Sequence, residues 1–91
     1  MNLSALEKAV EMIGNDRVSG QSLLIYGLIM TINARQGGQL YLLSKLREMQ
    51  PETRQLAYEI MDIYARGDSD QPQWGVLVEQ ANRAFQGDKI N

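Results

Sequence analysis

The sequence predicts an all-α domain, a compact five-helix bundle whose second helix, at about residues 20–36, is buried at the centre. Three observations lead to this prediction. The first is a nearly continuous apolar stretch, in which every residue from Leu23 to Ile32 is large and apolar except Gly27 and Thr31. The second is the helical spacing of apolar residues in four flanking segments. The third is the shortness of the polar links, which suits helices that pack against their sequence neighbours.

The apolar stretch is expected to be helical because it lacks strict alternation and proline, and because Ser19-Gly20 and Gly37-Gly38 flank it. A helix that is apolar on nearly every face must be covered on nearly every face, since each fully buried Leu, Ile or Met contributes about 1.5–3 kcal/mol. Its apolar part is far shorter than the roughly 20 residues that cross a bilayer. We therefore expect a core helix and no membrane span.

Small residues recur along this helix. Gly20, Gly27 and Ala34 are spaced by seven residues, so they form one stripe on the helix surface. Such a stripe lets another helix approach closely. Two interpretations remain open, which are tighter packing within one subunit and a seam for self-association.

The first flanking helix is predicted at residues 3–13. Ser4 and Glu7 form a possible capping box, and Asn2 is an alternative cap. Gly14-Asn15 is expected to end this helix, because both residue types tolerate the left-handed conformation that a helix terminus needs.

The other three helices are predicted at residues 40–49, 51–66 and 74–85. Pro51 suits the first position of a helix, where its missing N–H is no loss. Gly67 is expected to cap the fourth helix. Residues 68–73 form the most polar loop, and the tail at residues 87–91 is expected to fray.

The length of 91 residues suits one domain, which we expect to cover residues 1–91. With 44% hydrophobic and 22% charged residues, the composition is typical of a globular protein. The net charge is −2, and acidic and basic residues are interspersed along the sequence. This pattern argues against electrostatic binding to nucleic acid or to a membrane surface.

Cysteine and histidine are absent from the sequence. Disulfides, thiolate nucleophiles and Ser-His-Asp catalysis are therefore excluded within one chain, and zinc sites without either residue are rare. The lack of cysteine fits a reducing compartment, and residues 1–21 are amphipathic and carry acids where a secretory signal has a basic start. We expect a cytoplasmic protein with no metal and no cofactor.

A calcium site is weighed in the loop before the fifth helix, where Asp68, Asp70 and Glu79 occupy the first, third and twelfth places of an EF-hand loop. The match fails at Gln73, because that place needs a glycine for the sharp turn, and Pro72 occupies the fifth place. The two aspartates are instead expected to separate the fourth and fifth helices.

Catalysis is not expected. Glu59 and Asp62 lie one helical turn apart, but both fall in a surface phase of the fourth helix, where a solvated face is the simpler interpretation. Gly37-Gly38 lacks the further glycines and the lysine of a phosphate-binding loop.

DNA binding through a helix-turn-helix is the first alternative function, because short helices flank the glycine turn. The cations beyond that turn are Lys45, Arg47 and Arg54. The third helix offers only Gln39 and Tyr41 as polar side chains at its start, and Glu48 and Glu52 offset the positive charge. Nucleic acid is therefore an unlikely partner.

Protein recognition remains as the expected function. We expect a non-enzymatic interaction or regulatory module that forms a homodimer, since a small bundle gains stability by covering leftover apolar surface. The candidate interface residues are Gly20, Tyr26, Gly27, Met30, Ala34, Tyr58, Met61 and Trp74. For each of them, packing within the core is the alternative interpretation. A small helical inhibitor or immunity-type protein is the remaining functional alternative.

Overall fold

The computed structural model describes residues 2–34 and 39–87, and for residues 39–42 it describes the backbone alone. Within these ranges the chain forms five α-helices, one 3-10 turn and no strand, which confirms the predicted all-α class. The elements are α1 (Ser4–Asn15), α2 (Gly20–Ala34), α3 (Gln39–Leu46), α4 (Pro51–Ala65), η1 (Asp68–Asp70) and α5 (Pro72–Gln86). Outside the described residues lie residues 35 and 36 of the predicted second helix, the Gly37-Gly38 turn and residues 88–91 of the predicted tail.

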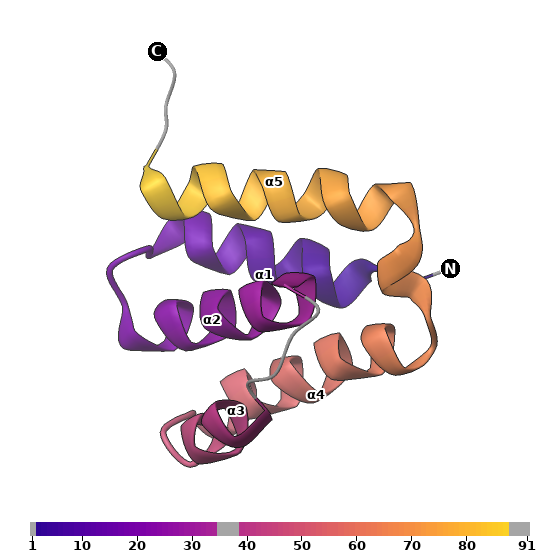
Figure 1. The fold of residues 1–91 in the computed structure, drawn as a ribbon. Coiled ribbons are helices and arrows are strands. Elements are labelled where there is room, and N and C mark those ends of the chain that lie inside the picture. Colours follow the sequence, from indigo (N-terminus) through magenta and orange to yellow (C-terminus); the bar gives the residue numbers. More distant parts are fainter. Residues whose placement is uncertain (1, 35–38, 88–91) are drawn as a thin grey trace.

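Four helices pack side by side, and α3 lies at one end of α4 (Figure 1). α1 and α5 run in the same direction and share the most extensive contact, while α2 and α4 run the opposite way. Each of α1 and α2 contacts the other and also α4 and α5. The two N-terminal helices therefore form the middle of the bundle.

The core is built from apolar residues that recur at helical spacing on α1, α2, α4 and α5. Its largest fully buried apolar side chains are Leu6, Ile13, Ile25, Leu28, Ile29, Ile60 and Ile63. Three alanines, Ala9 on α1, Ala57 on α4 and Ala81 on α5, are also completely buried. Because an alanine occupies little space, these positions allow the helices to approach closely around the larger side chains.

The prediction that α2 is covered on nearly every face holds for most of the helix, since four of its residues are buried and seven are half-buried, and Leu23 is the one exposed residue away from its two ends. The buried residues of α2 are Ser22, Ile25, Leu28 and Ile29, whereas Leu23 on the opposite side is 54% exposed. The apolar composition of a helix indicates how much of its surface has to be buried, but the positions of the neighbouring helices determine which side is buried.

The start and end of α1 differ from the prediction. The backbone N–H of Ser4 donates to the Asn2 Oδ1 at 3.0 Å, and the predicted capping box does not form, so Asn2 acts as the alternative cap. α1 also continues through Gly14-Asn15. At Gly14 the helix passes close to α5, where an added Cβ would lie 3.8 Å from the Cβ of Ala84. The helix thus extends to Asn15, two residues beyond the predicted end, at a point where α1 packs against α5.

The remaining helix ends follow local chemistry. Ser19 starts α2, because its Oγ accepts hydrogen bonds from the backbone N–H groups of Gln21 and Ser22. Pro51 begins α4, and Gly67 follows it with a φ of +83°, as predicted. α5 begins at Pro72, two residues before the predicted start, since proline is already set for the first helical position.

The connection between α3 and α4 is held by one side chain of α2. The Gln21 Nε2 donates to the backbone oxygen of Glu48 at 3.2 Å, and the Gln21 Oε1 accepts from the backbone N–H of Gln50 at 2.9 Å. α3 ends at Leu46, earlier than predicted, and the turn that follows places Met49 in the core at 4% exposure.

Two glycines should respond oppositely to replacement by alanine. Gly75 lies inside α5 and Gly67 has a positive φ, and an added Cβ meets nothing within 4 Å at either position. Gly75→Ala is expected to stabilise the fold by about 0.5–1 kcal/mol through helix propensity, and Gly67→Ala to destabilise it by about 1 kcal/mol through the left-handed backbone. Urea unfolding of both variants checks this. Equal effects would contradict the placement of Gly75 inside α5 and of Gly67 beyond the end of α4.

Candidate protein interface

One side of α2 carries small and apolar residues that are exposed or half-buried, although its Met30 also packs against the core. This side consists of Gly20, Leu23, Gly27, Met30 and Ala34, which we call the outer face of α2. These five residues follow the spacing i, i+3, i+7, i+10 and i+14 that is typical of helix-to-helix seams. Gly20, Leu23 and Ala34 are exposed, and Gly27 and Met30 are half-buried.

No residue of α2 carries a charge. On an ordinary surface helix the outward side holds Lys, Glu, Arg or Asp, which keep that side in water. In α2 the outward side offers glycine, alanine, leucine and methionine, and an added Cβ at Gly20 would meet nothing within 4 Å. The start of this face, at Gly20, therefore leaves room for a neighbouring helix.

The orientation of this face is set by polar contacts on the flanks of α2. The hydroxyl of Tyr26 donates to the Asn82 Oδ1 at 2.7 Å, and its ring stacks on Phe85 with centroids 4.2 Å apart. Tyr26 is thus half-buried and packs against α5. Since these contacts fix the rotation of α2 about its axis, they hold the outer face toward solvent.

Trp74 also belongs to the interior. It is 3% exposed, and its Nε1 donates to the Asn33 Oδ1 at 3.1 Å, which joins the start of α5 to the end of α2. Met61 is half-buried and packs against the core from α4. For these two candidates the structure shows the core packing that the sequence left open.

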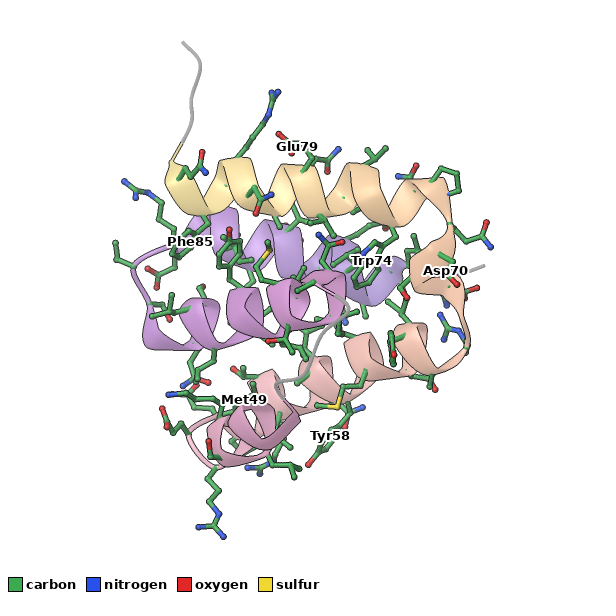
Figure 2. The ribbon with its side chains drawn as sticks, viewed as in Figure 1. Met49, Tyr58, Asp70, Trp74, Glu79 and Phe85 are labelled. Atoms are coloured by element: carbon green, nitrogen blue, oxygen red, sulfur yellow. The ribbon has the colours of Figure 1, made fainter. Side chains whose placement is uncertain are left out.

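Tyr58 is 47% exposed on α4, and its side chain points away from α2 (Figure 2). It borders a hollow between α1 and α4. The structure therefore divides the predicted interface residues into the outer face of α2, a separate exposed tyrosine, and interior side chains. Leu23, which was not among the predicted interface residues, joins the outer face, and its place beside the small-residue stripe is the signal that identifies it.

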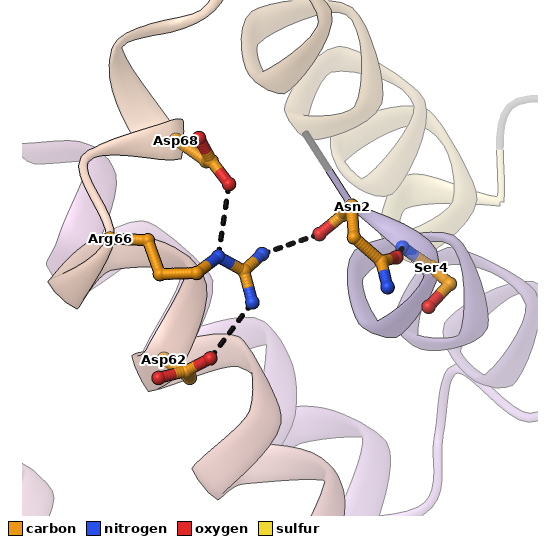
Figure 3. A network of polar contacts seen from close by, with 5 residues as sticks. All are labelled: Asn2, Ser4, Asp62, Arg66 and Asp68. Atoms are coloured by element: carbon orange, nitrogen blue, oxygen red, sulfur yellow. Dashed lines mark hydrogen bonds and ion pairs between the residues drawn. The ribbon is translucent and has the colours of Figure 1, made fainter.

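Arg66 ties the end of α4 to the start of α1 (Figure 3). Its Nη1 donates to the Asp62 Oδ2 at 2.8 Å, its Nε to the Asp68 Oδ2 at 3.0 Å, and its Nη2 to the backbone oxygen of Asn2 at 2.6 Å. The hydrogen bond to Asp68 is the main reason why the pKa of Arg66 is raised above its usual value. Each of the three guanidinium nitrogens therefore donates to an oxygen of the chain itself.

The residues considered for calcium do not come together. Asp68 pairs with Arg66, while Glu79 lies on the solvent side of α5, where its Oε2 is 3.4 Å from the Arg83 Nε (Figure 2). Across the described ranges, no three His, Cys, Asp or Glu side chains are grouped in a way that could hold a metal ion.

A hollow of about 610 Å³ lies where the ends of α2 and α4 meet the start of α5. Among the described residues that border it, Tyr64 and Asp70 are the only ones with titratable side chains. Glu59 and Asp62 lie elsewhere and are exposed, with Gln55 and Arg66 as their respective hydrogen-bond donors.

The cations considered for DNA binding are partly engaged in the chain. The Lys45 Nζ lies 3.6 Å from the Glu48 Oε2, and the Arg54 Nη1 donates to the backbone oxygen of Met49 at 3.4 Å. Arg47 is exposed, whereas the side chains of Gln39 and Tyr41 lie outside the part that the structure describes. This arrangement does not favour a basic recognition helix.

No helix in the described ranges has the length and apolar character needed to cross a membrane. Comparisons with protein-family models, with curated proteins and with solved structures found no match.

Proposed function

We propose that this domain acts without catalysis, as a regulatory or adaptor module that binds protein, and that it binds a second copy of itself through the outer face of α2. One observation supports the proposal above all. α2 has no charged side chain over its 15 residues, and on its outer face Leu23 is exposed while Gly27 and Met30 are half-buried. Apolar surface on a helix face is a common mark of an interaction site, because covering it gains about 25 cal/mol per Å².

The shape of the outer face suits a two-fold dimer. Gly20 and Ala34 each lie seven residues from Gly27. A two-fold axis at Gly27 with antiparallel helices therefore places Gly20 of one copy opposite Ala34 of the other, and the same surface is used twice. With small residues at the contact, the helix axes can come within about 8 Å. Leu23 and Met30 then pack alongside the neighbouring helix.

The proposed location is the cytoplasm. The chain contains no cysteine, which fits a reducing compartment, and the part of it that the structure describes has no helix able to span a bilayer. A cytoplasmic adaptor of this kind would present the remaining helix faces of the dimer to other proteins.

Sedimentation equilibrium tests the self-association directly. We expect twice the chain mass of 10.3 kDa at concentrations of about 1–100 µM. Because the outer face of α2 carries no charge, raising the salt concentration should leave the dimer intact. A mass of 10.3 kDa throughout this range would remove the homodimer.

A further inference from the structure

A groove between α1 and α4 runs along a different side of the molecule. It consists of two adjoining hollows of about 510 Å³ and 250 Å³, and Lys8, Gln55 and Glu59 border both. We call it the α1–α4 groove. Its apolar lining side chains, of which two are buried and two are half-buried, are Ala5, Ile63, Met12 and Leu56.

The α4 wall of this groove is acidic. Glu52, Gln55, Glu59 and Asp62 follow one another at helical spacing and are all exposed. Asp62 is paired with Arg66 and Glu59 accepts a hydrogen bond from Gln55, whereas neither Glu52 nor Glu59 forms an ion pair with a described residue, Lys8 lying across the groove from them. The α1 wall differs, since Lys8 is its one charged side chain bordering either hollow in the described chain.

At the end of the groove beside α1's first turn, the Arg66 network joins α4 to Asn2 (Figure 3). Arg66 is held between two aspartates and a backbone oxygen, so its charge is compensated within the chain. The net charge offered to an incoming ligand along the α4 wall is therefore negative, and the half-buried Met12 and Leu56 contribute apolar surface to the base of the groove.

We propose that the α1–α4 groove binds an amphipathic helix of another protein, with an apolar side and one basic flank. The wall from Glu52 to Arg66 is about 21 Å long, which matches about four turns of ligand helix. Glu52 and Glu59 are two turns apart, so lysines or arginines seven residues apart on the ligand can face both carboxylates. The ligand flank that faces Lys8 is neutral or acidic.

A second copy of this chain does not have that chemistry. Its described helices carry few cations, and none of them has two cations seven residues apart. The groove uses α1 and α4 and no residue of the outer face of α2. The groove and the proposed dimer are thus independent, and either can fail alone.

A synthetic peptide of about 15 residues tests the groove. The probe is a fluorescein-labelled helix with leucines on one side and lysines along one flank, and the control carries glutamates at the lysine positions. In fluorescence anisotropy we expect saturable binding of the lysine peptide, weakening as salt rises, and at least about tenfold weaker binding of the glutamate peptide. Absence of binding by the lysine peptide, or equal binding of both peptides, overturns the proposal.

Two charge reversals of equal size locate the binding. Glu59→Lys in the groove is expected to weaken the lysine peptide about tenfold, while Glu79→Lys on the solvent side of α5 changes the affinity less than about twofold. Circular dichroism checks that both variants are folded. Equal weakening by the two reversals shows unspecific attraction and contradicts the groove.

Amide chemical shifts of the labelled protein identify the occupied surface. On adding the lysine peptide we expect the largest changes at Lys8, Gln55 and Glu59. Changes concentrated on the outer face of α2 overturn the proposal. Chemical-shift changes at the groove that grow with protein concentration in the absence of peptide would show that a second copy occupies the groove. That result also overturns the proposal.

Discussion

Replacing Trp74 with alanine is expected to lower the free energy of unfolding by about 3–5 kcal/mol, the usual cost of deleting a large buried side chain. Trp74 is 3% exposed, and its indole Nε1 donates to the Asn33 Oδ1 at 3.1 Å. The ring therefore connects the first turn of α5 with the last turn of α2. In a small domain, whose total stability is about 5–15 kcal/mol, this loss is large.

Urea unfolding followed by far-UV circular dichroism measures the effect, because Trp74 is the one tryptophan and its fluorescence is lost with it. Trp74→Phe keeps most of the ring and removes the hydrogen bond, so it should cost only about 1–2 kcal/mol. Val76→Ala, at a 48% exposed position on the same helix, should cost less than about 0.5 kcal/mol. Unchanged stability of Trp74→Ala together with lost self-association would make Trp74 a docking anchor and contradict its place in the core.

Leu23→Glu is expected to turn the proposed dimer into a monomer without unfolding the chain. Leu23 is 54% exposed in the monomer, so a glutamate there remains solvated, and its position in the first turns of α2 suits a negative charge. In the dimer the same carboxylate would be buried without a partner, once in each copy. We expect the dissociation constant to rise at least about 100-fold.

Val76→Glu is the matched control for this substitution. It also places a glutamate at a half-exposed aliphatic position, but on α5 and away from the outer face of α2. Sedimentation equilibrium should therefore report a dimer for Val76→Glu and a monomer for Leu23→Glu, with similar circular dichroism spectra. Dissociation by both variants, or by neither, would place the self-association surface elsewhere.

Much of the fold was predictable because helices are determined by short-range chemistry. Apolar periodicity located the helices, and Pro51 and Gly67 marked the two ends of α4 through their fixed and left-handed backbone angles. The end of α1 was placed too early because Gly14 packs beside Ala84, a residue far along the chain. A local signal for termination was outweighed there by a tertiary contact.

The candidate site was only partly predictable. The small-residue stripe with Gly27 at its centre could be seen from spacing alone, but whether a residue beside it lies toward the core depends on the rotation of α2. Tyr26 and Trp74 were ambiguous because an amphipathic aromatic side chain suits both a core and an interface. Their partners Asn82 and Asn33 are 56 and 41 residues away along the chain, so no local pattern reveals them.

The sequence by itself determined the all-α class, the approximate extent of each helix and the presence of one helix that is too apolar to be fully exposed to water. Only the tertiary structure decided that Leu23 is the exposed residue in the body of α2, that Trp74 is interior, and that α1 and α4 border a groove with an acidic wall. Backbone propensity and apolar periodicity depend on residues that are close in the sequence, so the sequence alone reveals them. Which face of a helix is buried depends on contacts with helices that are distant along the chain.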